Sequence, residues 1–403
     1  MPDLRLSFES RLLRRMLRSL GDPPVEIELG WWPGRHFVAG TNQPLRRVRI
    51  KDRQTLLGLL RNPQIRFGDA YSSGQIEIEG DLIDFMAMML RVLAAPDTPE
   101  SLWRRFAHWR NRSRRHNSLT GSLDNIHRHY DLGNDFYALW LGETMAYTCA
   151  YFPSGQAGLD QAQVAKMDHV CRKVRLGASD TVVEAGCGWG SLALHMARIY
   201  GAKVRAFNIS AEQIDYARSW ARRLGLANRV EFVQDDYRNI DGRYDVFMSV
   251  GMLEHVGREH YRELGGVIRA SGAARGLVHS IGRNRPEPLH SWIERRIFPG
   301  AYPPSLGEMM QIFEPWNISV LDVENLRLHY ALTLRCWLKN FEAALDKVRS
   351  LSFDERFLRM WRLYLASSAA AFETGDLQLF QIVFAAATNN HVPLSREFMY
   401  REP

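Results

Sequence analysis

Apolar and polar positions follow two different periods between residues 157 and 281, and this pattern predicts helices and strands in turn. Short runs rich in β-branched residues are typical of buried parallel strands, whereas apolar residues three or four positions apart indicate helices. The predicted strands are 181–185, 203–208, 230–234, 244–250 and 276–281, and the predicted helices are 160–174, 191–200, 211–224 and 259–271. This order is typical of an α/β fold with a doubly wound, mainly parallel sheet.

The pattern changes after residue 282. Residues 283–316 are apolar and broken by prolines, so we expect them either to cover the strand ends and wall an apolar channel or to form a plain helical cap. A strand at 318–325, helices at 332–348 and 354–372, and an antiparallel final strand at 379–385 are predicted to follow.

The first hundred residues have the pattern of a small α+β domain. Strands are predicted at 25–29, 47–51 and 75–79, and helices at 54–60 and 82–93. Residues 4–20 predict an amphipathic helix whose polar face carries Arg11, Arg14, Arg15 and Arg18. Two interpretations of that helix stay open: it docks on an anionic bilayer, or it packs on its own domain.

Composition narrows the class of protein. The chain has 403 residues, of which 46% are hydrophobic, and this length favours two domains. The sequence contains no run of ~18 apolar residues, so no membrane span is predicted. The charged N-terminus lacks the apolar core of a signal peptide. The four cysteines lie far apart, which argues against a zinc site and a disulfide framework and fits the cytoplasm. The net charge of +7 favours an anionic partner, either nucleic acid or a membrane surface.

A basic, aromatic segment separates the two predicted domains. Its arginines are Arg104, Arg105, Arg110, Arg112, Arg114 and Arg115, and Trp103, Phe106 and Trp109 lie among them. Such a segment can bind RNA, because bases stack on aromatic rings, or can lie on phospholipid headgroups. It can also be a solvated linker.

Three glycines at alternate positions follow the first predicted strand of the sheet. Gly186, Gly188 and Gly190 follow Glu184, which lies two residues before the first glycine, and a predicted helix begins at residue 191. A dinucleotide site requires a different glycine spacing, and a P-loop requires a lysine that is absent. The interpretation that remains, apart from an ordinary strand–helix turn, is a site for S-adenosylmethionine, which carries no phosphate.

Further candidate residues follow the other strands, where ligands bind in such sheets. Asn208 and Gln213 stand where an acid usually binds ribose, and Asp235 or Asp236 can accept from the adenine amino group. Glu254 and His255 offer an acid and a base near the methyl end of the cofactor, although they can equally be a helix-start acid and a packed histidine. The Asn/Asp-Pro-Pro-aromatic motif of base-methylating enzymes is missing after the 244–250 strand.

Aromatic residues are dense at 127–152, where His, Asp, Asn, Thr and Cys are interleaved with the rings. Aromatic side chains at this density usually form core, but the polar residues between them also fit a lined pocket.

Several blocks, in order, make the chain similar to the cyclopropane-fatty-acyl-phospholipid synthases, a family that includes the mycolic acid cyclopropane synthases. The blocks are His-Tyr-Asp-Leu-Gly-Asn at 129–134, Tyr-Thr-Cys-Ala-Tyr-Phe at 147–152, Glu-Ala-Gly-Cys-Gly-Trp-Gly at 184–190, Ser-Ala-Glu-Gln at 210–213, Ser-Val-Gly-Met-Leu-Glu-His-Val-Gly at 249–257, His-Ser-Ile-Gly at 279–282 and Ile-Phe-Pro-Gly at 297–300. The resemblance covers residues 120–390, and residues 64–86 resemble the smaller N-terminal domain of two-domain members.

The resemblance implies a Rossmann-like class I methyltransferase sheet with a smaller N-terminal α+β domain. The implied domains are a lipid-engaging domain at 1–100, a basic linker at 101–120 and a catalytic domain at 121–403. The implied reaction transfers a methylene group from S-adenosylmethionine to the cis double bond of an unsaturated phospholipid acyl chain. A cyclopropane ring forms through a carbocation that bound bicarbonate deprotonates.

The resemblance also implies the site residues. The residues expected at the bicarbonate are Cys149, Glu254, His279, Ile281 and Tyr330. With Glu184, Gly190 and Ser249 added from the strand ends, the residues expected at the cofactor are Tyr147, Thr148, Glu184, Gly186, Gly188, Gly190, Asn208, Ile209, Gln213, Asp235 and Ser249. Thr148, Asn208 and Asp235 replace the serine, threonine and glutamine that are usual in the family.

The expected partners are unsaturated phospholipid and an anionic membrane surface, without nucleic acid. The chain is expected to lie in the cytoplasm at the inner face of the membrane, and the resemblance suggests a homodimer. Three alternatives stay open: a fatty-acyl methyltransferase that leaves a methyl or methylene branch, a small-molecule or RNA methyltransferase, and a silent lipid-binding protein.

Overall fold

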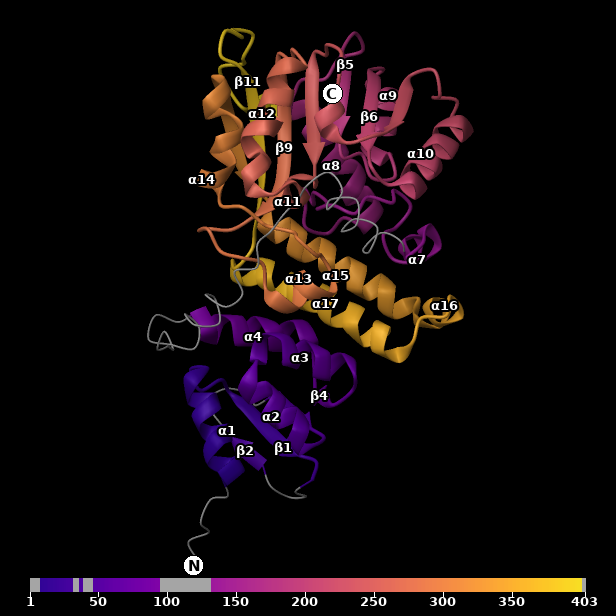
Figure 1. Ribbon diagram of the computed structural model, residues 1–403. Coiled ribbons are helices and arrows are strands. Elements are labelled where there is room, and N and C mark those ends of the chain that lie inside the picture. The colour runs from indigo at the N-terminus through magenta and orange to yellow at the C-terminus, as the bar shows by residue number, and fades with distance from the viewer. Residues whose placement is uncertain (1–7, 32–35, 39–45, 95–131, 401–403) are drawn as a thin grey trace, which may run out of the picture. The chain divides into compact units, whose positions relative to one another are not determined.

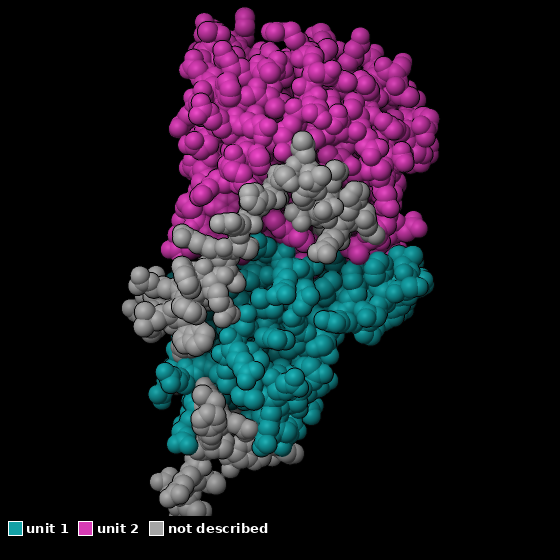
Figure 2. All heavy atoms as spheres, viewed as in Figure 1, with its two compact units in different colours: residues 1–114, 290–296, 345–376 teal, residues 115–289, 297–344, 377–403 magenta. Residues whose placement is uncertain are grey.

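The computed structural model describes residues 8–31, 36–38, 46–94 and 132–400, and its contacts divide the chain into two compact units (Figures 1 and 2). Unit 1 comprises Met1–Arg114, His290–Arg296 and Leu345–Asp376, and unit 2 comprises Arg115–Leu289, Ile297–Ala344 and Leu377–Pro403. The domain boundaries near residues 100 and 120 stay a prediction. Two stretches from the later part of the chain, His290–Arg296 and Leu345–Asp376, pack with unit 1.

Unit 2 contains a seven-stranded sheet in the order β10-β11-β9-β8-β5-β6-β7 (Figure 1). The strands are β5 (Thr181–Ala185), β6 (Lys203–Asn208), β7 (Val230–Gln234), β8 (Val246–Val250), β9 (Arg275–Gly282), β10 (Ile318–Asn325) and β11 (Gln378–Ala386). The five from β5 to β9 are parallel, and β11 runs antiparallel to both β9 and β10. The predicted α/β class and the antiparallel final strand are confirmed.

Helices cover both faces of this sheet. The helices of unit 2 are α7 (Asn134–Ala138), α8 (Leu159–Lys173), α9 (Ser191–Ile199), α10 (Ala211–Arg223), α11 (Leu253–Val256), α12 (Tyr261–Ala270), α14 (Leu306–Met309) and α15 (Arg327–Ala343), with short 3₁₀ turns at Tyr237–Asn239, Arg258–His260, Met310–Ile312, Glu314–Trp316 and Glu397–Met399. Helices α8, α9 and α10 share one core with the sheet, whereas α11, α12 and the 310–312 turn share the other. The sheet is therefore doubly wound, as predicted.

Burial explains why the central strands were recognisable from the sequence. Every residue of β8 is buried, and β5 is buried from its second residue onward, and apart from Thr181, Glu184 and Ser249 both strands are apolar. The edge strand β10 has a mixed pattern with exposed Leu321 and Val323. The predicted helix 332–348 is wrong as one element, because α15 ends at Ala343 and α16 (Leu345–Ser350) follows it in unit 1.

The proline-broken segment after β9 forms a packed cap over part of its length. Met309, Ile312 and Phe313 are fully buried beside Leu264 and Ile268 of α12. The helical-cap interpretation therefore holds for this stretch, and an apolar channel stays a prediction. The backbone N–H of Tyr302, in the same segment, donates to the carbonyl of Glu254 at 2.8 Å.

Unit 1 is built on a four-stranded sheet in the order β2-β1-β3-β4. Its strands are β1 (Val25–Leu29), β2 (His36–Val38), β3 (Arg46–Ile50) and β4 (Ile76–Ile78), and its first helices are α1 (Phe8–Ser19), α2 (Arg53–Arg61), α3 (Pro63–Ser72) and α4 (Leu82–Ala94). The predicted α+β character is confirmed, although β2 and α3 were not predicted. Leu13 and Leu17 of α1 are buried in the core, so the apolar face of this helix packs on its own unit.

The two later stretches join unit 1 through specific contacts. The guanidinium of Arg359, on α17 (Glu355–Thr374), donates to the carbonyls of Tyr71 at 2.6 Å and Ile76 at 2.9 Å. Arg296, which ends α13 (Ser291–Arg296), makes two hydrogen bonds of 2.9 and 2.8 Å with Asp69. No helix in the described part of the chain is long and apolar enough to cross a membrane.

Close strand packing in unit 2 predicts the effect of one added methyl group. A Cβ on Gly276 would lie 2.3 Å from the carbonyl oxygen of Phe247 and 2.4 Å from the ring of Phe384. We therefore expect Gly276→Ala to lower the free energy of unfolding by about 1–3 kcal/mol, measured by urea denaturation. Gly307→Ala is the matched control, because no described atom lies within 4 Å of that added Cβ. Equal midpoints for the two variants would contradict this packing.

Candidate active site

The glycine turn between β5 and α9 is built from backbone conformations that other residues avoid. Gly186, Gly188 and Gly190 have φ angles of +85°, +53° and +89°. A Cβ on Gly190 would lie 2.7 Å from the ring of Phe232 and 2.9 Å from Ala217, so this glycine allows helix and strand to pack. No described atom lies within 4 Å of a Cβ on Gly188, so the backbone there is open to a ligand.

Asn208, at the end of β6, fixes the glycine turn. Its amide Nδ2 donates to the carbonyl of Gly188 at 3.2 Å and to Oε1 of Gln213 at 2.7 Å. Its Oδ1 accepts from the backbone N–H of Ser210 at 3.3 Å. Asn208 and Gln213, both predicted to bind the cofactor, therefore contact each other, and Asn208 supports the loop that carries Gly188.

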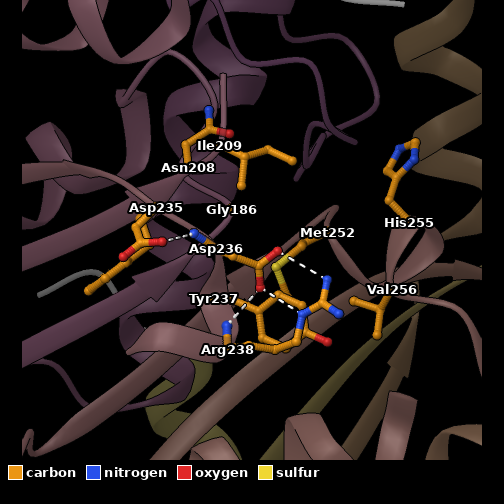
Figure 3. Close-up of a pocket in the computed structure, with 11 residues that line it drawn as sticks. Gly186, Asn208, Ile209, Asp235, Asp236, Tyr237, Arg238, Met252, His255 and Val256 are labelled. Atoms are coloured by element: carbon orange, nitrogen blue, oxygen red, sulfur yellow. Dashed lines mark hydrogen bonds and ion pairs between the residues drawn. The ribbon is translucent and has the colours of Figure 1, made fainter. Parts of the chain in front are cut away.

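A pocket opens at the carboxyl ends of β5, β6, β7 and β8 (Figure 3). Its lining residues are Gly186, Phe207, Asn208, Ile209, Asp235, Asp236, Tyr237, Arg238, Met252, His255 and Val256. This set includes four of the predicted cofactor residues. It adds Met252, Tyr237 and Arg238, which the sequence did not single out although they follow strand ends.

Two aspartates after β7 have different roles in this pocket. Oδ1 of Asp236 accepts from the backbone N–H of Arg238 at 2.9 Å and from its Nε at 2.8 Å, so Asp236 begins the next turn (Figure 3). Oδ1 of Asp235 accepts from the N–H of Asp236 and from Asn239, each at 2.7 Å. The Asp236–Arg238 ion pair occupies Asp236, which leaves Asp235 as the better candidate for the adenine contact.

Glu254, on α11, is a buried carboxyl group with one free oxygen. Its Oε1 accepts from the backbone N–H of Ile281 at 2.6 Å, whereas Oε2 has no hydrogen-bond partner among the described residues. Burial raises the pKa of Glu254 to about 7, although the Ile281 N–H opposes the rise. Ile281 was expected to contact a bound anion directly, but its N–H is committed to Glu254.

His255, the residue after Glu254, is one of the side chains at the pocket (Figure 3). It lines the pocket, and its ring centroid lies 6.0 Å from that of Phe298. Burial lowers the pKa of His255 to about 4, so the ring is neutral at physiological pH. A role for Glu254 and His255 as an acid and a base stays a prediction.

His279 and Ser249 bring two more polar atoms to the ends of β9 and β8. Both side chains are buried, and within the described part of the chain His279 Nε2 and Ser249 Oγ have no partner. Burial lowers the pKa of His279 well below its usual value, and the nearby charges of Lys166 and Lys173 lower it further. Unpaired buried polar atoms are costly, so each of these two atoms indicates a position where a ligand can bind. The register pairs Ser249 with Val278 and His279 with Val250, so the two side chains lie on opposite faces of the sheet.

A buried lysine of α8, which the sequence did not indicate, contacts the 147–149 loop. Lys166 of α8 donates from Nζ to Oγ1 of Thr148 at 2.9 Å. Burial lowers the pKa of Lys166 to about 8 and raises the pKa of Glu184 to about 7. A Cβ on Gly251 would lie 2.8 Å from Cγ2 of Thr148, so this loop lies against the end of β8.

Cys149 is a buried thiol rather than a nucleophile. Its Sγ contacts the carbonyl of Ala150 at 3.1 Å and that of Leu326 at 3.9 Å. Burial raises the pKa of the Cys149 thiol far above its usual value, so the thiolate does not form. The interpretation of Cys149 as a polar contact agrees with this environment.

Aromatic rings surround the predicted Tyr147 and connect it to Tyr330. The ring centroid of Trp337 lies 5.3 Å from that of Tyr147 and 5.9 Å from that of Tyr330. Tyr137 and Trp140 lie 5.6 and 5.3 Å from Tyr147 and are buried, so they belong to the core. The core interpretation therefore holds for Tyr137 and Trp140, and a pocket lined by this stretch stays a prediction. The basic linker and residues 127–131 lie outside the described residues.

Comparisons with known proteins agree with this geometry. The family model described as mycolic acid cyclopropane synthetase matches residues 117–382, and a domain family of unknown function matches residues 12–93. A probable fatty acid methyltransferase of Pseudomonas putida is 37% identical over 97% of this chain and 100% of its own length. The cyclopropane-fatty-acyl-phospholipid synthase of Escherichia coli K12 is 32% identical over 87% of this chain and 90% of its own length.

A solved structure agrees as well. Mycolic acid cyclopropane synthase CmaA1, complexed with SAH and CTAB, superposes with a TM-score of 0.62 at 26% identity. The match covers 65% of this chain and 98% of that protein.

The raised pKa of Glu254 predicts a pH dependence of stability. Between pH 4.5 and about 7 the folded protein keeps a proton on Glu254 that the unfolded chain loses, so rising pH lowers the free energy of unfolding. The pKa change corresponds to about 3 kcal/mol at most. Glu254→Gln removes this contribution, so its stability relative to wild type should improve from pH 5 to pH 8 in urea denaturation. Histidine titrations are common to both proteins and cancel, and parallel pH profiles would contradict the assignment.

Proposed function

The chain belongs to the mycolic acid cyclopropane synthetase family, and we propose that it transfers a methylene group to the cis double bond of an unsaturated phospholipid acyl chain, forming a cyclopropane ring. The family makes it an S-adenosylmethionine-dependent lipid methyltransferase. The observation that carries the finer proposal is that Glu254 Oε2, just after β8, and His279 Nε2, on the neighbouring strand β9, are both buried without a partner among the described residues.

S-adenosylmethionine supplies an electrophilic methyl group, and the pocket residues fit this cofactor. The open backbone at Gly188 and the acid Asp235 would hold the adenosine portion, and Asn208 keeps the turn in place. The buried carboxyl of Glu184 supplies negative charge that a sulfonium and an ammonium group require.

Aromatic walls protect the reacting chain from water. An alkene is a weak nucleophile, so it has to be held in line with the methyl group in a dry cavity. Methyl transfer leaves a carbocation on the acyl chain, and water would trap it as an alcohol. The rings of Tyr147, Tyr330 and Trp337 can stabilise a cation without reacting, by about 2 kcal/mol for a desolvated ring.

Bicarbonate fits the polar atoms at the other side of the site. His279 Nε2 and Glu254 Oε2 lack partners among the described residues, and the Cys149 thiol is neutral. His279 and Glu254 would hold the anion, and the charge of Lys166 would favour it. The anion would supply a base for the proton that leaves the added methyl group. Ile281 contributes by orienting Glu254.

A second candidate function is a fatty-acyl methyltransferase whose product keeps a methyl or methylene branch without ring closure. One observation favours it: a relative that is 37% identical over 97% of this chain is a probable fatty acid methyltransferase. The same polar atoms could serve either outcome, because both require a proton to leave the alkylated chain.

Lipid as substrate requires access to a membrane, and we propose peripheral association with an anionic inner surface. Arg11, Arg14, Arg15 and Arg18 are exposed on α1 while its apolar face is buried. Basic residues on the neighbouring sheet pair with acids instead, as in Lys51–Glu77 at 2.9 Å. The arginines of α1 therefore offer the charge that attracts anionic lipids. We also propose that the protein forms a homodimer.

Product analysis tests the proposed reaction. Purified protein is incubated with unsaturated phospholipid vesicles and methyl-labelled S-adenosylmethionine, and the recovered fatty acids are studied by proton NMR. Upfield cyclopropane protons with loss of the olefinic signal are expected. Labelled lipid with vinylic or branched-methyl signals would favour the second candidate, and unlabelled lipid would contradict both.

A variant pair connects the product to the site. Glu254→Gln should abolish lipid labelling while the affinity for S-adenosylmethionine changes little, because the amide does not replace the carboxyl group that holds the anion serving as the base. Glu259→Gln, at an exposed carboxylate on the following turn, is the control and should label lipid as wild type does. Equal losses of labelling and affinity in Glu254→Gln would overturn its placement beside the reacting chain.

A further inference from the structure

Three polar residues form a row across neighbouring strands of the unit 2 sheet. Glu324 of β10 is the register partner of Gln381 of β11, and Gln381 is the register partner of His279 of β9. Directly opposed residues share one face of a sheet, so the three side chains lie side by side. Gln381 and His279 are at most 1% exposed, which makes this row a buried polar structure in otherwise apolar strands.

Helix α8 covers this row with polar side chains. Gln163, Lys166, His169 and Lys173 are all buried and recur every three or four residues, so they share one face of the helix. Lys173 Nζ donates to Gln381 Oε1 at 2.7 Å and to Glu324 Oε2 at 2.5 Å, and His169 Nε2 lies 2.8 Å from the same carboxylate oxygen.

Charges at the outer end of the row are firmly paired. Although its partial burial favours the neutral form, the hydrogen bonds and charges of His169 and Lys173 lower the pKa of Glu324 to about 2. Glu324 is thus ionised at physiological pH and holds the ammonium of Lys173 in place. Lys173 in turn is fixed beside Gln381.

This arrangement determines the orientation of the Gln381 amide. An ammonium group only donates hydrogen bonds, so the amide atom facing Lys173 is the oxygen. The amide nitrogen consequently faces the His279 ring, where Nε2 of Gln381 lies 3.2 Å from Nδ1. An amide nitrogen only donates, so Nδ1 of His279 accepts and carries no proton. The ring proton therefore resides on Nε2.

The protonated nitrogen is the one that has no partner. His279 Nε2 is buried without a hydrogen-bond acceptor among the described residues. The residue lies at the end of β9, where its carbonyl accepts from the N–H of Gly251 at 2.9 Å, in the loop that also carries Glu254. An N–H donor is thus presented within the polar part of the candidate active site.

We propose that Gln381, oriented by Lys173 and Glu324, is a positioning residue that holds His279 as a neutral hydrogen-bond donor through Nε2. The significance for catalysis rests on the proposed function. His279 binds a negatively charged oxygen at the reaction centre and does not remove the proton from the alkylated chain. Burial lowers the pKa of His279, which agrees with a neutral ring.

The tautomer of His279 can be measured directly. Two-bond proton–nitrogen correlation spectra of ¹⁵N-histidine-labelled protein distinguish protonated from unprotonated ring nitrogens, and His279→Asn identifies the signal of this residue. The wild type should show an unprotonated Nδ1 and a protonated Nε2 at neutral pH. The reverse pattern, or an imidazolium, would overturn the proposal without any further variant.

Gln381→Glu tests the cause. A carboxylate at this position accepts from both Lys173 and His279, so the ring proton should move to Nδ1 or the ring should become charged. The kcat for lipid methylation should fall about 10- to 100-fold, as for other groups that orient a histidine. The KM for S-adenosylmethionine should change little, because Gln381 does not line the cofactor pocket.

Gln378→Glu is the matched control. Gln378 is buried on the same strand, but its Oε1 accepts from Asn325 at 2.7 Å, and its register partner on β9 is Gly282 rather than His279. This variant should keep both the tautomer and kcat. A His279 signal unchanged by Gln381→Glu, or an altered tautomer with unchanged kcat, would overturn the proposal. A wild type that labels no lipid would instead refute the proposed function, since the tautomer is measured without turnover.

Discussion

Unit 2 depends on the burial of polar and charged groups that its own residues only partly satisfy. Lys166, Glu184, Glu254 and His279 are all removed from water, and burial shifts the pKa of each toward the neutral form. A folded protein tolerates such groups only when the surrounding structure provides enough compensating stability. The largely apolar strands and the two cores around them provide it. The fold therefore keeps buried polar groups whose remaining hydrogen-bonding capacity a ligand can use.

The sequence predicted those strands, helices and turns whose formation depends on residues close together in the chain. The apolar runs of β5 and β8 and the glycines after β5 identify a buried strand and its turn, because period and backbone freedom can be read within a few residues. The grouping of α17 with unit 1 depends on Arg359 and on partners nearly 290 residues earlier. The short strand β2 likewise depends on pairing with β1. Neither feature has a local signal.

The candidate site also contains some residues that the sequence predicted and others that it missed. Cofactor residues that follow strand ends were predicted because strand order brings those ends together, and Gly186, Asn208, Ile209 and Asp235 do line one pocket. Lys166 was missed because one lysine in an amphipathic helix normally faces water. Gln381 of β11 was missed because a glutamine, too, is usually exposed to water. Polar residues at positions where the pattern predicts burial are thus the signal to search for, since each needs a partner that only the fold reveals.

Calorimetric titration with S-adenosylmethionine at pH 7 tests the central claim most directly, which is that a buried, partly protonated carboxyl group complements the positive charges of the cofactor. The titration is run in two buffers with different enthalpies of ionisation. Binding should saturate at one site and release a proton, because the sulfonium and ammonium groups favour the ionised form of Glu184, whose pKa is raised to about 7. The observed heat should then differ between the buffers. Absence of binding, or the same heat in both buffers, would contradict the account.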